Sequence, residues 1–414
     1  MADNKDKKVL NVPALRFLEF TEEWKRIRVS DLLDFYSTNS LSWEQLEYKL
    51  NEPYNLHYGL IHVGLPILVD LTKDELPSIK EGNVPKKYEL CKEGDVAFAD
   101  ASEDTNEVAK VVEFYNLDGK KVVCGLHTIH GRDNNKQTAK GFLGYCFSST
   151  VFHYQIRRIA QGTKIYSINT RNFSEVFVGL PSKSEQHKIA TLLKLIDERI
   201  STQNKIIEDL RLLRDAIMVE HYRKCNKSKL CIYDIGEPFN VMNLSKDDLT
   251  KDGSPCIIYG ELFTTYGCVI ENVVSHTTKS PNSTLSTKGD LLFPASTTVD
   301  ALSLIAPSSI NEDGIILGGD MFGIHVNEQY NSNYLSYYFN IIGKKNLAKY
   351  AKGSTIIHLH YADIQKAKIT LPNKNEQEAV ANLLLKVEHK LNIEQKMLIN
   401  YLNTKNFLLW QMFI

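Results

Sequence analysis

Two long stretches of the chain carry the apolar pattern of amphipathic helices. Apolar residues recur at alternating spacings of four and three residues in 184–225 and again in 375–414, and neither stretch contains proline or glycine. This is the heptad pattern of a coiled-coil seam. The pattern predicts a helix over each stretch, about 60 Å long at 1.5 Å per residue. Ser184 and Asn375 are residue types that favour the N-cap, and Glu-Gln follows each of them.

The two seams match position by position. Polar residues interrupt both at the same steps, Gln203 and Glu394 at one and Arg214 and Lys405 at another, always 191 residues apart. Because a polar residue within a seam fixes register, the match favours pairing of the two helices with each other. We expect an antiparallel arrangement, because each helix must lead away from its own domain. The alternative is that each helix packs only on its own domain. The residues predicted to form the seam are Ile189, Leu193, Ile196, Ile200, Ile207, Leu210, Val380, Leu384, Val387, Leu391, Leu398 and Tyr401.

The stretches 15–183 and 226–374 have a different pattern. Both consist mainly of short apolar runs separated by Gly, Asn and Asp, which is typical of strands and turns. Each also contains a helical pattern near its end, at 152–161 and 333–353. The predicted fold class is therefore α+β: two mixed α/β domains joined by two long helices that form an antiparallel coiled coil. Residues 1–14 are expected to be an N-terminal tail.

An internal duplication underlies this organisation. Residues 160–193 and 351–384 align without a gap and are identical at 11 of 34 positions. Weaker similarities extend upstream, with Gly-Asp at Asp95 and at Asp290. Each half of the chain therefore contains a variable domain followed by a conserved helix.

Composition narrows the possible functions. The chain has 49 Lys and Arg against 50 Asp and Glu, which disfavours nucleic-acid binding through bulk charge but allows local basic patches. No apolar run reaches the roughly 18 residues of a membrane span, and the first ten residues lack the apolar segment of a secretory signal. We therefore expect no membrane association and a cytoplasmic location.

Residues that carry chemistry are few. The seven cysteines are scattered without a Cys-x-x-Cys pair, so we expect reduced thiols and no zinc site. His358 and His360, and His127 and His130, are close in sequence, but packing or DNA contact is favoured over metal binding. There is no phosphate-binding loop and no Gly-x-Ser-x-Gly motif. We therefore expect no catalytic residue, metal or cofactor in this chain.

Polar and basic residues mixed with aromatics gather in a few loops. Lys, Ser and Thr suit phosphate contacts, whereas Arg, Asn and Gln suit base edges. The loops at Gly162 and Gly353 recur in both halves while their surroundings diverge, which favours a function in DNA binding over that of solvated surface loops. The predicted DNA-contacting residues are Arg132, Asn134, Asn135, Lys136, Lys164 and Tyr166 in the first domain, and Thr297, Thr298, Ser354, Thr355, His358 and His360 in the second.

Several of these segments resemble one known family. The lead-in PALRFLEFTEEWKRIRVSDLLDF looks like the opening of the specificity subunit of Type I restriction-modification enzymes. LPSKSEQHKIATLLKLIDERI and LPNKNEQEAVANLLLKVEHKL resemble the central and distal conserved helices of that family. The resemblance extends from about residue 13 to residue 414. Val380, Asn382 and the apolar C-terminal residues NFLLWQMFI depart from the family pattern.

The resemblance implies a non-catalytic subunit that reads double-stranded DNA, with one target recognition domain for each half of a split target. It also implies that two methyltransferase subunits dock on the paired helices and that motor-endonuclease subunits join them. S-adenosylmethionine, ATP and magnesium would then belong to those partners. The alternatives are a stand-alone DNA-modifying enzyme and a coiled-coil module that binds other proteins.

Overall fold

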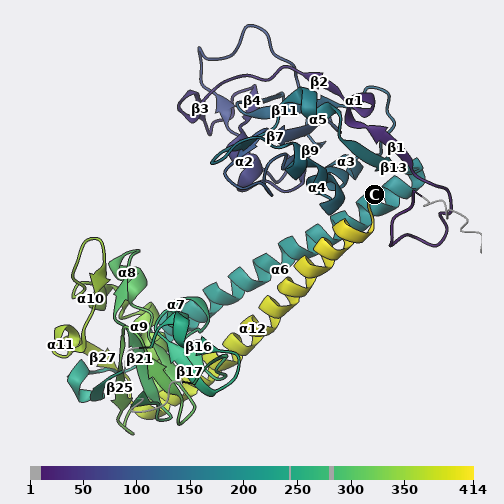
Figure 1. The fold of residues 1–414 in the computed structure, drawn as a ribbon. Helices are drawn as coiled ribbons and strands as arrows, with labels where there is room; N and C mark the ends of the chain where they lie inside the picture. The colour runs from purple at the N-terminus through teal and green to yellow at the C-terminus, as the bar shows by residue number, and fades with distance from the viewer. Residues whose placement is uncertain (1–10, 242–243, 279–283) are drawn as a thin grey trace, which may run out of the picture. The chain divides into compact units, whose positions relative to one another are not determined.

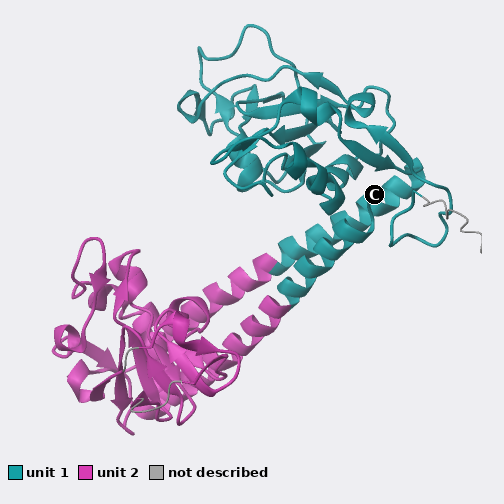
Figure 2. Cartoon of the chain, viewed as in Figure 1, with its two compact units in different colours: residues 1–203, 397–414 teal, residues 204–396 magenta. Residues whose placement is uncertain are grey.

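The computed structural model describes residues 11–241, 244–278 and 284–414. The chain divides into two compact units (Figure 2). Unit 1 contains residues up to 203 together with 397–414, and unit 2 contains 204–396. Each unit is a mixed α/β domain with part of both long helices, and the predicted fold class is confirmed.

The two long helices begin close to their predicted positions. They are α6 (Lys183–Lys224) and α12 (Lys374–Gln411) (Figure 1). The predicted N-caps Ser184 and Asn375 are wrong, because these residues lie within the first turns. The capping side chains are those of Ser182 and Asn373, which accept hydrogen bonds from the backbone N–H three residues on, at 3.4 and 3.0 Å. A proline stands directly before each cap.

The same ion pair joins the two helices in both units. In unit 1, Lys405 Nζ lies 2.5 Å from Asp197 Oδ1. In unit 2, Arg214 Nη1 lies 3.5 Å from Glu388 Oε2. Asp197 and Glu388, like Arg214 and Lys405, are 191 residues apart, so the pair is a product of the duplication. The later residue of α6, Arg214, contacts the earlier residue of α12, Glu388, so the antiparallel pairing is confirmed. All twelve predicted seam residues are buried or half-buried.

Two main sheets form the domain of unit 1. The strand order in its five-stranded sheet is β2 (Asp34–Tyr36), β11 (Thr128–Arg132), β7 (Val96–Ala99), β9 (Val111–Asn116) and β5 (Leu68–Asp70). The order in its four-stranded sheet is β10 (Val122–Cys124), β4 (Tyr54–Leu56), β6 (Ser78–Ile79) and β3 (Leu46–Glu47). Two small pairs complete it: β1 (Lys25–Arg28) with β13 (Phe177–Leu180), and β8 (Ala101–Ser102) with β12 (Tyr166–Ser167).

Unit 2 repeats this arrangement. Its first sheet has the order β15 (Gly236–Asn240), β25 (Met321–Val326), β21 (Asp290–Pro294), β23 (Ser308–Ile310) and β18 (Val269–Ile270). Its second has the order β16 (Leu249–Thr250), β19 (Ser275–Thr277), β17 (Ser254–Ile258), β24 (Ile316–Gly318) and β20 (Thr284–Leu285). The small pairs are β14 (Ser228–Cys231) with β27 (Lys368–Leu371), and β22 (Ser296–Thr297) with β26 (Ile357–His358).

Strand direction shows that the duplication includes the whole domain. The edge pairs β5–β9 and β18–β23 are both parallel, as are β4–β10 and β17–β24. The pairs β7–β11 and β21–β25 are both antiparallel. The two domains therefore share one topology, although their sequences resemble each other only in segments.

Short helices cover the sheets. Unit 1 contains α1 (Val29–Leu32), α2 (Tyr58–His62), α3 (Phe142–Phe147), α4 (Thr150–Ile159), α5 (Thr170–Ser174) and the 3-10 helix η1 (Trp43–Gln45). Unit 2 contains α7 (Glu261–Thr264), α8 (Ala301–Leu304), α9 (Ser332–Ile341), α10 (Lys344–Ala348), α11 (Tyr361–Ile364), η2 (Ile232–Asp234) and η3 (Lys246–Asp248). The predicted helices at 152–161 and 333–353 correspond to α4 and to α9 with α10. None of the helices in the described ranges is long and apolar enough to cross a membrane.

The repeated Leu-Pro-x-x-x-Glu-Gln box fastens each long helix to its domain through the glutamine. The Gln186 side chain accepts a hydrogen bond from the Ala139 N–H (2.7 Å) and donates one to the Pro181 carbonyl (2.9 Å). Gln377 makes the equivalent bonds in unit 2, to a loop N–H at 2.9 Å and a proline carbonyl at 2.8 Å. Both glutamines are buried, so these bonds replace the hydrogen bonds to water that the side chains cannot make.

The box glutamate connects α6 to the N-terminal lead-in. Glu185 is buried and accepts two hydrogen bonds of 2.7 Å from the Arg16 guanidinium. The Trp24 indole N–H donates a third, at 3.2 Å. These bonds give the lead-in motif a structural role, because they hold it against the first turn of α6.

We expect the seam to contribute equally to the stability of both units. Leu193→Ala and Leu384→Ala, at equivalent fully buried positions, should each lower the free energy of unfolding by about 2–5 kcal/mol, through lost burial and a residual cavity. The neighbouring Leu195 and Leu383 are 54% and 47% exposed, and their alanine variants should change it by about 0.5 kcal/mol or less. Denaturant unfolding of the four variants measures this. Equal losses at buried and exposed positions would contradict the assigned seam.

Candidate nucleic-acid interface

The duplicated loops at Gly162 and Gly353 form the same small antiparallel ribbon in both units. Strand β12 pairs with β8 in unit 1, and β26 pairs with β22 in unit 2. Each ribbon closes through two backbone hydrogen bonds, between Gln161 and Ser167 at 2.9 and 2.8 Å and between Lys352 and His358 at 2.9 and 2.7 Å.

Glycine is required in both ribbons. Gly162 has φ +135° and Gly353 has φ +120°, a conformation that other residues rarely adopt. A Cβ at these positions would lie 1.9 Å from the Ile165 carbonyl oxygen and 2.0 Å from that of Ile356. The tight turn therefore explains why the glycine persists in both halves of the sequence.

Side chains on the ribbon fall into two classes. The inward-facing Ile168 and Leu359 are equivalent, buried and apolar. Exposed positions differ between the halves: Lys164 corresponds to Thr355, and Asn169 to His360. The duplication has therefore kept the backbone of the ribbon and changed the groups that it presents.

The structure brings the second-domain candidates together. Thr297 and Thr298 lie at β22, opposite the loop and strand that carry the other four candidates, namely Ser354, Thr355, His358 and His360. The rings of His358 and His360 are nearly parallel, with centroids 6.1 Å apart. All six residues are exposed or half-buried, so the ribbon of unit 2 presents hydroxyl and imidazole groups to solvent.

The first-domain candidates form two separate groups. Lys164 and Tyr166 lie on the ribbon, next to the start of β11, where the Asp100 N–H donates to the His127 carbonyl at 3.1 Å. The other four, Arg132, Asn134, Asn135 and Lys136, lie at and beyond the end of β11. Strand β11, which is roughly 13 Å long at 3.3 Å per residue, lies between the two groups.

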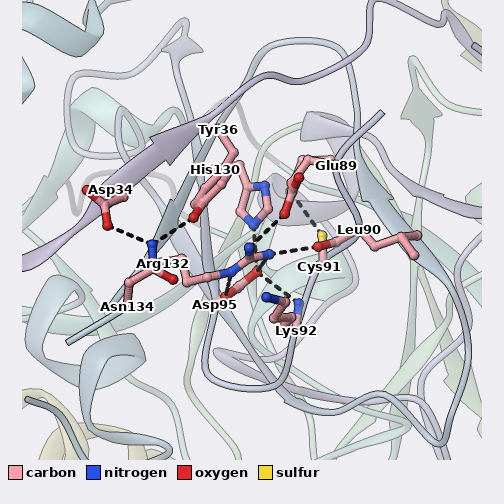
Figure 3. Close-up of polar contacts among 11 residues, drawn as sticks. Asp34, Tyr36, Glu89, Leu90, Cys91, Lys92, Asp95, His130, Arg132 and Asn134 are labelled. Atoms are coloured by element: carbon pink, nitrogen blue, oxygen red, sulfur yellow. Dashed lines mark hydrogen bonds and ion pairs between the residues drawn. The ribbon is translucent and has the colours of Figure 1, made fainter. Parts of the chain in front are cut away.

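Arg132 lies inside the domain, in a polar network around Asp95 (Figure 3). Its Nε and Nη2 donate to the two oxygens of Asp95, both at 2.8 Å. Nη1 donates to Glu89 at 2.6 Å, and Nη2 also reaches the Leu90 carbonyl at 2.7 Å. With its side chain only 7% exposed, Arg132 has a structural role, and its position does not support the predicted contact with DNA.

Asp95 is the centre of this network. It also accepts hydrogen bonds from His130 Nε2 at 2.7 Å and from the Lys92 N–H at 2.8 Å. Burial acts to raise the pKa of Asp95, but the bonds from His130 and Arg132 outweigh it and hold the pKa below its ordinary value. The carboxylate therefore remains charged near neutral pH.

The second domain contains the same aspartate arrangement. Asp290 accepts the Thr287 N–H at 2.8 Å and lies 2.7 Å from Nδ1 of His325 on β25. By strand register, His325 occupies the place that Arg132 has on β11. The duplicated Gly-Asp motif is thus a structural element: an aspartate at the start of a strand, paired with a basic side chain from the neighbouring strand.

Near the ribbon of unit 1, the structure brings Tyr58 and His62 together with His127, the only one of the three that the sequence singled out. The Tyr58 ring centroid lies 5.9 Å from that of His62 and 5.2 Å from that of His127. His62 Nε2 is 3.0 Å from the carbonyl oxygen of Ala101 on β8. The segments 54–62 and 127–130 approach one another only through the sheets, so no local pattern could have indicated this group.

Basic residues directly precede both ribbon loops. Arg157 and Arg158 are exposed at the end of α4, and Lys345 and Lys349 are exposed in and after α10. Their spacing before the glycine is visible in the sequence and could have identified them. They add positive charge beside the polar ribbon, as contact with a phosphate backbone requires.

The position of Arg132 leads to a stability prediction. Arg132→Met should lower the free energy of unfolding by about 3–5 kcal/mol, because it leaves the buried Asp95 without its strongest partner. Asn135→Ala, at an exposed position of the same loop, should change it by about 0.5 kcal/mol or less. Denaturant titration of both variants tests this. An Arg132→Met protein of unchanged stability that has lost DNA affinity would contradict this structural role and indicate that Arg132 contacts DNA.

Comparison with known proteins identifies the family. The model of the Type I restriction modification DNA specificity domain matches residues 113–212 and 229–403. A provisionally named MjaX type I restriction enzyme specificity subunit of Methanocaldococcus jannaschii is 24% identical over 406 residues, covering 91% of this chain and 90% of the relative. The MjaVIII specificity subunit of the same organism is 21% identical over 418 residues, covering 93% and 91%.

Solved structures share the fold. The S subunit of a Type-I restriction-modification system from M. genitalium has a TM-score of 0.61 at 16% identity, covering 97% of this chain and 99% of its own. A chain from a study of assembly and conformational transition in the type I R-M system has a TM-score of 0.55 at 14% identity, covering 93% and 96%. With the family model matching more than half of its length, this chain belongs to the family of Type I restriction-modification DNA specificity proteins.

Proposed function

We propose that the chain is the DNA-reading, non-catalytic subunit of a Type I restriction-modification complex and that each domain reads one half of a bipartite target. One observation carries this proposal: both domains present the same glycine-dependent ribbon with different exposed side chains. A shared backbone with different side chains is what two unrelated half-sites require, because base edges are distinguished by the donors and acceptors that meet them.

Each ribbon combines two kinds of DNA contact. In unit 1, Arg157, Arg158 and Lys164 are exposed cations that suit phosphates, and the half-buried Tyr166 offers an aromatic ring and a hydroxyl beside them. In unit 2, lysines of α10 take the phosphate role beside the hydroxyl and imidazole groups of the ribbon. Such local basic groups allow binding although the chain has a net charge of -1.

The long helices supply the surface for the partner subunits. Large apolar side chains are exposed on α6 and α12 in both units: Leu195, Leu212, Leu213, Leu383, Ile393, Ile399, Phe407 and Trp410. In unit 1, a surface hollow of 340 Å³ lies beside Leu195, lined by Phe17 and residues of the first turns of α6. Exposed apolar groups in this number mark a surface that another protein covers.

We assign this helical surface to two methyltransferase subunits, with motor-endonuclease subunits joining the complex. S-adenosylmethionine, ATP and magnesium then act in those partners, and this chain contributes target choice. The assignment rests on family membership and on the apolar helix surface, and it places the complex in the cytoplasm together with host DNA.

Exchange of one domain tests the proposal directly. Replacing residues 15–180 by the same segment of another specificity subunit should change only one half of the methylated target, because the second ribbon is untouched. The exchange must keep Met412 and Phe413, which directly follow α12 and pack in the core of unit 1. Sequencing of methylated sites after co-expression with the methyltransferase gives the readout.

The reciprocal exchange of residues 226–371 is the matched control and should change the other half-site only. A change in both half-sites from a single exchange would show that the domains do not read separately. Loss of all methylation in a chimera that is folded but does not bind the methyltransferase would instead locate the fault in helix docking.

Lys164 is expected to contact a phosphate. Lys164→Ala should weaken binding of the assembled complex to cognate and altered sites alike and reduce the slope of log affinity against log salt by about 1. An unchanged affinity and salt slope for Lys164→Ala would contradict this contact. Lys136→Ala, an exposed lysine at the far end of β11, tests the second group of candidates in the same way. Fluorescence anisotropy at several salt concentrations measures both quantities. Equal losses in the two variants would place both ends of β11 on DNA.

A further inference from the structure

Three potential metal ligands meet in the core of unit 1. Cys91 lies just before β7, Cys124 ends β10, and His130 lies in β11. Their ligand atoms, two sulfurs and one ring nitrogen, all lie within 4.8 Å of one another, and the two sulfurs are 3.5 Å apart. The three residues are 6%, 2% and 0% exposed. The cluster is therefore assembled from one loop and two strands and is almost fully buried.

One ring nitrogen of His130 has no partner, which indicates that this site binds a ligand. His130 Nε2 is bonded to Asp95, whereas the buried Nδ1 has no hydrogen-bond partner among the described residues. Figure 3 shows this second nitrogen turned away from Asp95. A buried polar atom without a partner is energetically unfavourable. Histidines that ligate metals typically bond their other ring nitrogen to a carboxylate, which is the relation that His130 has with Asp95.

The donor set favours zinc. Two thiolates and an imidazole are ligands that Zn²⁺ prefers. With Zn–S bonds of about 2.3 Å, two sulfurs on a tetrahedral zinc are roughly 3.8 Å apart, close to the separation of 3.5 Å between Cys91 and Cys124. The two thiolates also cancel the charge of the ion, so binding adds no net charge to a buried site.

We propose that Cys91 Sγ, Cys124 Sγ and His130 Nδ1 form a structural zinc site in the first domain. Binding releases one proton from each thiol. The fourth ligand is a solvent molecule that enters from a cavity of 260 Å³ lined by Cys124 and Glu89. The ion joins β10 of the four-stranded sheet to β11 of the five-stranded sheet. This proposal departs from the expectation from the sequence, which was reduced thiols and no zinc site.

The second domain lacks this donor set. By strand register and backbone bonding, the positions equivalent to Cys91, Cys124 and His130 are Ser286, Leu317 and Gly323. Instead of an imidazole, the Phe239 ring fills the space above Gly323, where a Cβ would lie 2.1 Å from the ring. The shared topology therefore forms without the cluster, and the zinc site is an addition specific to the first domain.

Zinc titration of the full chain tests the proposal. Protein stripped with a chelator is titrated with zinc chloride, and native mass spectrometry should show one zinc per chain. Cobalt chloride in place of zinc should produce the intense near-ultraviolet band of cobalt–thiolate bonds. Cys91→Ser, Cys124→Ser and His130→Gln should each lose stoichiometric zinc. Cys146→Ser and Cys256→Ser, at buried cysteines outside the cluster, should retain it.

The titration of the wild-type chain tests the zinc site even if a variant fails to fold. Uptake of one zinc, a cobalt–thiolate band and a melting temperature that rises with zinc and falls again with chelator would support the site. A wild-type chain that takes up no zinc would overturn the proposal. Undiminished zinc binding by a folded Cys91→Ser/Cys124→Ser double variant would overturn it as well.

Discussion

Each unit depends on a helix segment that comes from the other half of the sequence. The last turn of α12 and the residues that follow it bring Leu408, Met412 and Phe413 into the core of unit 1. The Phe413 ring centroid lies 6.4 Å from that of Trp24 and 6.0 Å from that of Phe142. A backbone bond of 3.0 Å from the Leu15 N–H to the Gln411 carbonyl fixes this end. In unit 2, the end of α6 supplies the buried Met218. The antiparallel seam between α6 and α12 delivers both segments, so the domain cores depend on the pairing of the helices.

The residues preserved between the two halves are those that fix backbone geometry. Gln186 and Gln377 hold a helix start against a loop, and Asp95 and Asp290 hold a turn at the start of a strand. Gly162, like its counterpart in unit 2, allows a turn that no side chain would fit. The glutamine and aspartate side chains supply hydrogen bonds that backbone groups would otherwise lack. The glycines avoid a steric clash. Both penalties are large compared with the few kcal/mol of net stability of a domain.

Sequence reasoning succeeded where structure follows from local spacing. The heptad pattern predicted both long helices and their pairing, because apolar periodicity of a helix is set within a few turns. It misplaced the caps by two residues, since Ser182 and Ser184 are equally good N-cap types and only the backbone distinguishes them. It assigned Arg132 to the surface because a basic loop was visible, whereas its partner Asp95 lies 37 residues away in sequence and meets it only across two strands.

The meeting of Cys91, Cys124 and His130, and that of Tyr58 with His62 and His127, were not predicted for the same reason. Cys91 and Cys124 are 33 residues apart, and no short motif joins them. Their meeting depends on the pairing of β10 with the segment before β7, where the Cys91 N–H donates to the Val122 carbonyl at 2.8 Å. Long-range strand pairing is the part of a fold that local patterns specify least, because many registers satisfy the same alternation of apolar and polar residues.

In the proposed function, the separation of backbone-fixing and exposed residues within the ribbon lets one fold serve different DNA targets. The backbone of the ribbon depends on its glycine, on the closing bonds and on a buried apolar residue, Ile168 in unit 1 and Leu359 in unit 2. The exposed side chains, such as Lys164, make none of these contacts. A change at an exposed position therefore alters what the ribbon presents without altering how the domain folds. If the ribbon reads DNA as proposed, such a scaffold acquires a new half-site specificity by surface substitution, while its long helices stay constant.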